Sequence, residues 1–254
     1  MPGAFEGRVA LVTGATRGIG RAVALALGEA GANVVAVGRT VGALEELDDS
    51  IRDAGGPAPT LVPINLTDYD AIDRLGAALF ERWGRLDVLV GNAGILGQLS
   101  PLGHIPPKVW DETIGLNLTA NWRLIRSLDP LLRQSDAGRA VFLTAAQART
   151  AEPFWGAVAA SKAGLEALVR TYANEVRHTN VRVNLVDPGP TRTHFRGKAF
   201  PGEAKDAATP PGAHALPILA LLTPACLEHG SLIELGHPMA DDGIPASERT
   251  VGIA

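Results

Sequence analysis

A glycine-rich turn between two apolar segments constrains this chain more than any other feature. The run Thr13-Gly-Ala-Thr-Arg-Gly-Ile-Gly20 follows the apolar segment 8–12 and leads into residues 19–30, where apolar side chains recur at helical spacing. A strand that passes through glycines into a helix is typical of phosphate-binding turns, because the first N–H groups of the helix have no internal partner. A plain turn is the alternative, but the flanking strand and helix disfavour it.

The rest of the chain repeats the alternation of short β-branched runs and longer helical patterns. This order predicts a doubly wound, Rossmann-like α/β fold, with a parallel sheet of seven strands covered by helices on both faces. One domain of residues 1–254 is expected. The segment 189–212, rich in Pro and Gly, is either a substrate lid or a mobile surface loop, and 236–254 is an irregular tail. Strands are predicted at 8–12, 33–37, 60–64, 86–90, 140–144, 181–186 and 231–235, and helices at 19–30, 41–53, 68–83, 107–132, 155–178 and 213–222.

Composition argues against several function classes. The net charge of −4 over 254 residues gives no basic field for nucleic acid or for a membrane surface. No apolar run is long enough to span a bilayer, and no signal peptide is recognisable, so a cytoplasmic protein is expected. Cys226 is the only cysteine, which fits a reducing compartment, and the histidines lack the spacing of a metal site.

Four further motifs, together with the glycine turn, carry a family resemblance. They are Asn92-Ala-Gly94, Asn117, the run Trp155-Gly-Ala-Val-Ala-Ala-Ser-Lys162 and the run Pro188-Gly-Pro-Thr-Arg-Thr193. Over residues 5–235 the chain resembles the short-chain dehydrogenase/reductase family. The resemblance implies interconversion of a small-molecule carbonyl and alcohol by hydride transfer from a nicotinamide cofactor. It also implies a homodimer or homotetramer that pairs through the long helices.

The end of the second predicted strand bears on which cofactor binds. An NAD site needs a carboxylate there, whereas the strand ends Val37-Gly38-Arg39 and a second arginine, Arg17, lies in the glycine turn. Two guanidinium groups can bind a 2′-phosphate, so NADP(H) is favoured over NAD(H). Two solvated surface arginines are the alternative. The expected cofactor-binding residues are Gly14, Thr16, Arg17, Gly18, Ile19, Gly20, Arg39, Asn65, Leu66, Asn92, Ala93, Gly94, Lys162, Pro188, Gly189, Thr191 and Thr193.

The catalytic positions implied by the resemblance match only in part. Asn117 and Lys162 occupy the places of the family's asparagine and lysine, but Ala145 stands where a serine is expected and Val158 where a tyrosine is expected. Valine cannot donate a proton, and loss of a general acid removes about 10²–10⁴ in rate. Loss of an oxyanion donor removes a further ~10²–10³ at most.

Two hypotheses of function follow. The chain is either an NADP-dependent oxidoreductase impaired at the proton-transfer step, or a catalytically inactive NADPH-binding pseudoenzyme or scaffold. A nucleic-acid-binding dinucleotide fold is disfavoured, because the chain is acidic and aromatic residues make up only 5% of it.

Overall fold

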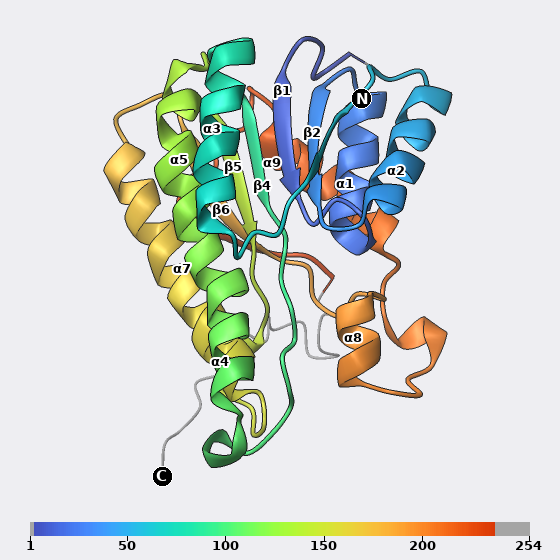
Figure 1. Ribbon diagram of the computed structural model, residues 1–254, viewed down its shortest axis with the longest axis vertical. Helices are drawn as coiled ribbons and strands as arrows, with labels where there is room; N and C mark the ends of the chain where they lie inside the picture. The colour runs from blue at the N-terminus through green and yellow to red at the C-terminus, as the bar shows by residue number, and fades with distance from the viewer. Residues whose placement is uncertain (1–2, 237–254) are drawn as a thin grey trace, which may run out of the picture.

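The computed structural model describes residues 3–236 and has a doubly wound α/β architecture (Figure 1). All strand pairs of the sheet are parallel, and the strand order is β3-β2-β1-β4-β5-β6-β7, so the predicted seven-stranded sheet is confirmed. Its central strands are buried, as expected where helices cover both faces. The strands are β1 (Val9–Thr13), β2 (Asn33–Gly38), β3 (Thr60–Pro63), β4 (Val88–Gly91), β5 (Arg139–Leu143), β6 (Arg182–Asp187) and β7 (Leu232–Glu234).

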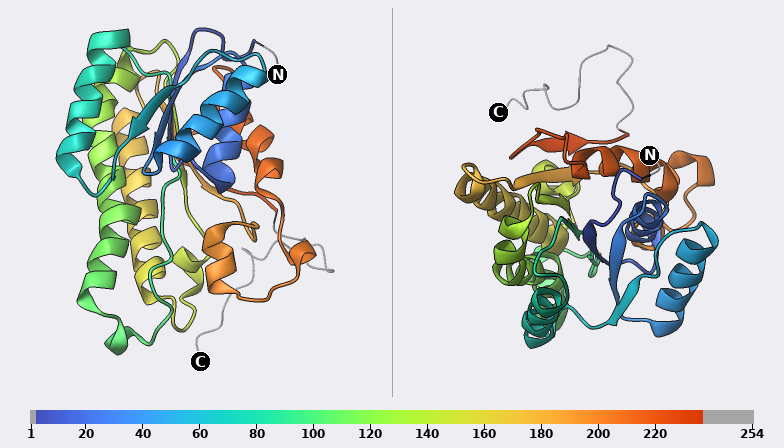
Figure 2. Two further views of the ribbon diagram at one scale, coloured as in Figure 1. Left: turned by 45° about the vertical axis from the view of Figure 1, so that its right-hand side comes forward. Right: turned by 90° about the horizontal axis from the view of Figure 1, so that it is seen from above.

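Helices cover the two faces of the sheet (Figure 2). Helices α1 (Gly18–Glu29), α2 (Val41–Asp53) and α9 (Ala215–Leu222) pack on one face through residues such as Leu27, Leu47 and Ile218. The other face is covered by α3 (Tyr69–Trp83), α5 (Ala120–Gln134) and α7 (Gly156–Val176), with α4 (Pro107–Ile114) preceding α5. Each helix thus buries one apolar stripe against strands, which is what the helical spacing in the sequence predicts.

Local signals explain where these helices begin and end. Asp68 caps α3 by accepting a hydrogen bond from the backbone N–H of Ala71 at 3.1 Å. Gly31 follows α1 with φ +93°, a left-handed conformation that suits glycine and ends the helix as predicted. None of the helices in the part of the chain that the structure describes has the length and apolarity needed to cross a bilayer.

Two segments differ from expectation. The predicted single helix at 107–132 is interrupted by a π-helical turn, Gly115–Thr119, before it continues as α5. The segment 189–212, expected to be irregular, contains α8 (His194–Ala199) and two 3₁₀ turns (Lys205–Ala207 and Pro211–His214). Its Pro and Gly residues hid these short helices, which are too brief to leave a periodic signal. The predicted tail at 236–254 lies outside the described residues apart from Gly236.

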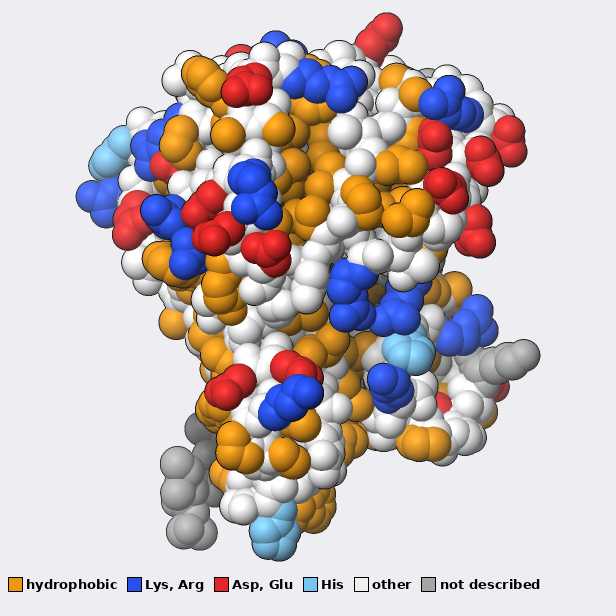
Figure 3. Space-filling model, in the orientation of Figure 1, with side chains coloured by type: hydrophobic (Ala, Val, Ile, Leu, Met, Phe, Trp, Pro, Cys, Tyr) orange, Lys and Arg blue, Asp and Glu red, His pale blue; other side chains and the backbone are white. Residues whose placement is uncertain are grey.

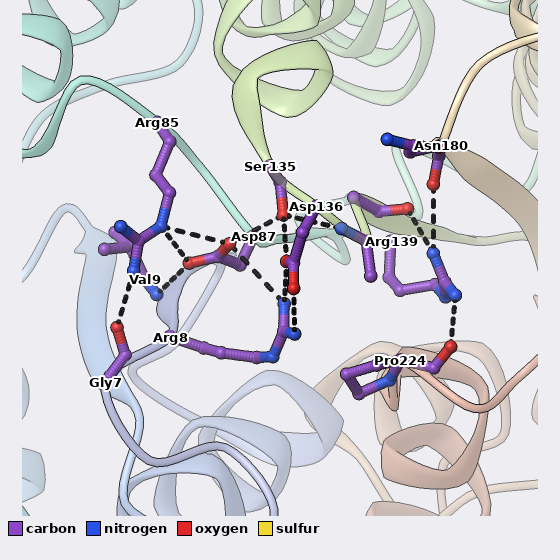
Figure 4. A network of polar contacts seen from close by, with 12 residues as sticks. Gly7, Arg8, Val9, Arg85, Asp87, Ser135, Asp136, Arg139, Asn180 and Pro224 are labelled. Carbon is purple, nitrogen blue, oxygen red and sulfur yellow. Dashed lines mark hydrogen bonds and ion pairs between the residues drawn. The ribbon is translucent and has the colours of Figure 1, made fainter.

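A polar network closes the amino end of the sheet (Figure 4). Asp87, 1% exposed, accepts hydrogen bonds from the Val9 backbone N–H at 2.8 Å and from Ser135 Oγ at 2.6 Å. Arg85 Nε also donates to Asp87 Oδ2 at 3.2 Å, and Arg8 Nη1 lies 3.5 Å from Asp87 Oδ1. A buried carboxylate with this many partners is a structural feature. The functional residues predicted from the sequence lie at the opposite end of the strands.

Candidate functional site

A large cavity lies at the carboxyl ends of the strands, where the chain order reverses between β1 and β4. Open parallel sheets commonly bind ligands at such a reversal. The cavity measures about 1070 Å³, and Figure 3 shows the hollowed face with Lys and Arg side chains around its opening. Most of the residues predicted for the cofactor line it: Gly14, Thr16, Arg17, Gly18, Ile19, Arg39, Asn65, Leu66, Asn92, Ala93, Gly94, Lys162, Pro188, Gly189, Thr191 and Thr193.

At Gly14 and Gly20 the glycine turn is packed too closely to admit a side chain. A Cβ on Gly14, whose φ is +64°, would lie 2.8 Å from Asn92 Nδ2. A Cβ on Gly20 would lie 2.4 Å from both Asn92 Nδ2 and the Gly14 carbonyl oxygen. Gly20 does not line the cavity, so its place in the motif is explained by packing of α1 against the turn.

Asn92 ties the ends of β1 and β4 together beneath the cavity. Its Nδ2 donates to the Thr13 carbonyl oxygen at 2.9 Å, and the backbone N–H groups of Asn92 and Ala93 donate to Thr13 Oγ1 at 2.9 and 3.1 Å. Thr13 Oγ1 in turn donates to the Val90 carbonyl oxygen at 3.1 Å. These bonds fix the floor of the cavity and leave its glycine-rich wall as exposed backbone.

Cationic side chains gather at one end of the cavity. Arg17 follows β1 and Arg39 follows β2, and both are exposed. His194 and Lys198 of α8 line the same cavity. The segment that leads into α8 lies close to the glycine turn, since a Cβ on Gly18 would lie 3.4 Å from Thr193 Cγ2. The positive charge of Arg17, followed by burial and by the charge of Lys198, lowers the pKa of His194. Among the described residues, the side chains at this end of the cavity carry the positive charge that an anion-binding site needs.

The predicted asparagine and lysine lie on neighbouring helices at the other end. Asn117 sits in the π-helical turn, where its Oδ1 accepts from the Ile95 N–H at 2.8 Å and its Nδ2 donates to the Ile95 carbonyl oxygen at 3.0 Å. Asn117 Nδ2 also donates to Ser161 Oγ at 3.0 Å. Asn117 is fully buried and does not line the cavity. A π turn inside a helix often marks a functional site.

Lys162 reaches the cavity wall from α7. Its Nζ donates to the Leu143 carbonyl oxygen at 2.6 Å, at the end of β5. Burial lowers the pKa of Lys162 to about 8, and the negative charges of Asp187 and Glu166 oppose that shift in part. An ammonium group at this position can donate hydrogen bonds to a ligand in the cavity.

Ala145 and Val158 occupy the two remaining catalytic positions and differ in exposure. Ala145 lines the cavity directly after β5. Val158 is 1% exposed and packs with Leu96 and Trp155 behind the cavity wall. Neither side chain carries a polar atom, so this part of the wall offers no proton.

The hydroxyl groups of Tyr172, Thr144 and Ser161 do not replace the missing serine and tyrosine. Tyr172 donates to Asp129 Oδ1 at 2.8 Å, burial raises its pKa well above the usual range, and it does not line the cavity. Thr144 lines the cavity, but its Oγ1 donates to Glu166 Oε1 at 2.9 Å. Ser161 accepts a hydrogen bond from Asn117 Nδ2 and donates to the Val158 carbonyl oxygen at 2.9 Å.

A charged cluster beside Lys162 was not predicted from the sequence. Arg149 contacts the carboxylates of Glu166 and Asp187, and also Glu234 at 3.1 Å. Glu166 and Asp187 are buried, and Arg170 pairs with Glu166 at 3.0 Å. The cluster joins the ends of β6 and β7 to α7. Its residues lie far apart in sequence, on α6 (Gln147–Thr150), α7, β6 and β7, and no local sequence pattern marks them.

The residues of the cavity fit a dinucleotide. Helix α1 begins at Gly18 with no side-chain cap and no acidic residue in its first turn, so its N-terminal N–H groups remain available to a phosphate. Arg17 and Arg39 carry the charge for a further phosphate, and no acid lies at the end of β2. Lys162, at the far end of the same cavity, supplies a donor for a sugar hydroxyl.

Comparison with known proteins agrees with this geometry. The family model described as short chain dehydrogenase matches residues 8–204. The chain is 36% identical over 198 residues to the uncharacterised oxidoreductase YciK of Escherichia coli K12, which covers 77% of this chain and 78% of that protein. It is 35% identical over 199 residues to an uncharacterised NAD-dependent oxidoreductase of Mycobacterium tuberculosis, with 73% and 72% covered.

Solved structures show the same likeness, and one of them contains a bound cofactor. A short-chain dehydrogenase of Shigella flexneri 2a, crystallised as a complex with NADP, superposes with a TM-score of 0.88 at 32% identity. The superposition covers 92% of this chain and 99% of that chain. With its sheet order, its glycine turn and matches of this extent, the chain belongs to the short-chain dehydrogenase family.

Proposed function

We propose that this protein is an NADP(H)-binding oxidoreductase of the short-chain type whose carbonyl–alcohol interconversion is impaired by Ala145 and Val158. The observation that carries the proposal is one cavity that joins the glycine turn, Arg17 and Arg39 at one end to Lys162 and Ala145 at the other. The NADP complex of the Shigella relative supports the cofactor. The NAD-dependent relative from Mycobacterium makes NAD the alternative to be tested.

Each part of the cavity has a separate task in this proposal. Arg17 and Arg39 bind the 2′-phosphate, and the N-terminus of α1 binds the pyrophosphate. Lys162 binds the nicotinamide ribose, while Asn117 holds the loop at Ile95 that forms one wall. The bound nicotinamide supplies the hydride. A carbonyl oxygen beside Ala145, with Val158 behind the cavity wall, would meet neither the serine nor the tyrosine of the family and would take its proton from water, which makes the reaction slow.

Cofactor binding is tested first by calorimetric titration. The proposal expects NADPH to bind in the micromolar range and NADH at least tenfold more weakly, because only NADPH carries the phosphate that two arginines contact. Equal affinity for both would remove the role given to Arg17 and Arg39. No binding of either would overturn the proposal.

The inactive pseudoenzyme is the second candidate, favoured by the burial of Val158 behind an apolar wall. The variant Ala145→Ser combined with Val158→Tyr separates the two. Slow NADPH-dependent reduction of a carbonyl panel by the natural chain, accelerated in the variant, supports an impaired enzyme. Activity that is present only in the variant supports the pseudoenzyme. Equal activity in both chains would show that positions 145 and 158 are not the catalytic positions.

Pairing into a homodimer or homotetramer through α4, α5 and α7 stays a prediction, as does a cytoplasmic location. Trp110 on α4 is 36% exposed and Trp122 on α5 is 44% exposed, so these helices carry large apolar groups that a partner could cover. Sedimentation at micromolar concentration is the measurement, and a monomer would contradict the prediction.

The segment 189–212 is proposed as the substrate lid, because α8 lines the cavity.

A further inference from the structure

Helix α8 has two chemically different sides. His194 and Lys198 are four residues apart, so they share one side of the helix, and both are exposed. Phe195 and Ala199 are also four residues apart and share the neighbouring side, which is half-buried. All four residues line the cavity. The helix is therefore basic on one side and apolar on the next.

The start of α8 lies against the glycine turn. A Cβ on Gly18 would be 3.4 Å from Cγ2 of Thr193, the residue that precedes the helix. The charge of Arg17 is the largest cause of the lowered pKa of His194, ahead of burial and of the charge of Lys198. The basic side of α8 is thus within electrostatic reach of the glycine turn.

The end of β2 meets the same turn. A Cβ on Gly38 would lie 2.5 Å from Thr16 Cγ2, so the residues that precede Arg39 and Arg17 are in contact. Figure 3 shows Lys, Arg and His side chains gathered at one side of the cavity opening. We call the four side chains that the three segments contribute to the cavity the basic rim: Arg17, Arg39, His194 and Lys198.

The basic rim carries positive charge without a protein partner. Among the described residues, no carboxylate forms an ion pair with the two arginines or the lysine of the rim. The other cations of the lining are occupied. Arg196 Nη2 donates to Glu203 at 2.6 Å and its guanidinium lies 4.5 Å from the centre of the Phe200 ring, while Lys162 Nζ donates to the Leu143 carbonyl oxygen.

The acidic residues of the lining belong to other segments. Glu112 is on α4 and lies 4.0 Å from Lys108, Glu152 follows α6, and Asp187 ends β6 and is paired with Arg149. None of these three acids is on the glycine turn, β2 or α8. Unpaired like charges repel, and a phosphate dianion bound among them removes that repulsion.

The apolar side of α8 closes the other part of the cavity. It packs on the buried cluster of Leu96, Trp155 and Val158. The ring of Phe200, directly after α8, lies 5.9 Å from the ring of Trp155, centroid to centroid. We call this surface the aromatic wall: Leu96, Trp155, Val158, Phe195 and Phe200.

Hydrogen bonds at both ends make α8 a single unit. Thr193 Oγ1 caps the helix by accepting from the backbone N–H of Arg196 at 3.3 Å. The Arg196 side chain donates to both carboxylate oxygens of Glu203, at 2.7 and 2.6 Å. Because the helix has one turn and a half and is braced in this way, the position of its basic side also sets the position of its apolar side.

We propose that His194 and Lys198 are specificity-determining residues, which bind the 2′-phosphate of NADP(H) together with the two arginines of the basic rim. This contact holds the apolar side of α8 against the aromatic wall. The inference rests on the proposed NADP(H)-dependent function and adds that the phosphate of the cofactor organises the surface on which a substrate packs. NADH has no such phosphate and leaves α8 without this contact.

Two fragments of the cofactor test the binding step. Adenosine 2′,5′-bisphosphate carries the 2′-phosphate, and adenosine 5′-monophosphate differs only in lacking it. Calorimetry should show that Lys198→Gln weakens binding of the bisphosphate about threefold to tenfold, with a further loss when His194→Gln is added, and leaves the monophosphate unchanged. Lys108→Gln on α4, where the lysine is exposed, is the matched control for charge and should change neither affinity. Thermal melts confirm that each variant is folded.

Hydrogen exchange tests the effect on α8 without any turnover. Neither fragment contains nicotinamide, so neither touches the aromatic wall. At saturation the bisphosphate should slow amide exchange in residues 194–203 about tenfold, whereas the monophosphate should leave it near the rate of the free chain. The slowing should disappear in Lys198→Gln with His194→Gln.

The reverse coupling is tested from the apolar side. Phe195→Ala removes a contact with the wall and no charge, so it should lower the population of the docked helix and weaken the bisphosphate about threefold. Leu99→Ala is the matched control, because Leu99 packs against the same buried cluster from outside α8. It should leave the affinity for the bisphosphate unchanged.

The outcomes separate this inference from the proposed function. If NADPH and the bisphosphate bind but Lys198→Gln has no effect, or weakens both fragments equally, the assignment of α8 to the 2′-phosphate is wrong and the proposed function stands. Equal slowing of exchange by both fragments, or equal losses in Phe195→Ala and Leu99→Ala, would overturn the coupling in the same way. If NADPH itself does not bind, the proposed function fails and the inference fails with it.

Discussion

The two ends of the cavity differ in what their residues can do. At the adenosine end proposed here, Gly14 and Gly18 leave backbone exposed beneath Arg17 and Arg39, so every group that a dinucleotide phosphate needs is present. At the catalytic end, Lys162 and Asn117 are held in place by hydrogen bonds, yet Ala145 and Val158 offer none. Under the proposed function, cofactor binding and proton transfer should therefore be separable, because they would depend on different loops at the same edge of the sheet.

The two ends of the cavity also differ in how they are stabilised. The largest effect that we expect of a substitution, a change in the free energy of unfolding, follows from this difference. The adenosine end depends on close backbone packing, whereas the catalytic end contains the buried carboxylates Glu166 and Asp187, which Arg149 bridges. Arg149→Met should lower the free energy of unfolding by about 3–5 kcal/mol, because it leaves buried charges without their partner. Urea unfolding measures this loss. Arg170→Met, which removes a half-exposed partner of Glu166, should cost less than about 1 kcal/mol, and equal losses would contradict the assignment.

Lys162 allows the electrostatics of the catalytic end to be measured directly. Because burial lowers its pKa in the folded chain to about 8 from the 10.5 of an exposed lysine, the unfolded chain binds more protons between these pH values. The Lys162 contribution to stability should therefore rise with pH between about 8 and 10.5, by up to roughly 3 kcal/mol. The measurement is the difference in unfolding free energy between the natural chain and Lys162→Met across this range. A difference that is flat or falls with pH would contradict the account.

Substitution of Arg17 and Arg39 tests the adenosine end of the cavity. Arg17→Ala with Arg39→Ala should weaken NADPH binding about tenfold to a hundredfold and leave NADH binding unchanged, because the lost hydrogen bonds reach only the 2′-phosphate. Calorimetry with both cofactors gives the result. Arg52→Ala, an exposed arginine on α2 paired with Asp48, is the control for charge and should change neither affinity. Equal weakening of NADPH and NADH would show that these arginines bind some other part of the cofactor.

The smallest expected effect is the loss of stability caused by a larger side chain at position 158. A tyrosine there has to displace part of the packing of Leu96 and Trp155, so Val158→Tyr should lower stability by about 1–3 kcal/mol. Val158→Phe is the matched variant without the hydroxyl and should cost about the same. If carbonyl reduction rises in Val158→Tyr and not in Val158→Phe, the gain belongs to the phenol. A gain in both would assign it to the altered shape of the wall.

The sequence predicted the fold well for a physical reason, and it placed the expected cofactor residues on the loops that line the cavity. Strands and helices of this length leave strong periodic signals, and the glycines at 14, 18 and 20 sit between them at a fixed spacing. Lys162 and Asn117 were found through the family motif, and the structure brings both to the catalytic end. The roles of these residues are predictions, which measurements of binding and turnover test.

The charged cluster and the aromatic wall could not be predicted in the same way. Arg149 meets Glu166 and Asp187 only because β5, β6 and α7 converge, and no local pattern marks such long-range pairs. Phe200 packs near Trp155 because the segment 189–212 forms α8, which its Pro and Gly content concealed. The π turn at Asn117 was missed because a single extra residue barely alters helical periodicity.

A single-turnover experiment tests the separation of the two ends most directly. Excess enzyme binds NADPH, a ketone is added, and nicotinamide fluorescence is followed in the natural chain and in Ala145→Ser with Val158→Tyr. The account predicts the same rise in fluorescence on binding in both chains, followed by oxidation at least a hundredfold faster in the variant, the size expected for a restored general acid. Oxidation at equal rates in both chains, or a rise in fluorescence confined to the variant, would contradict it.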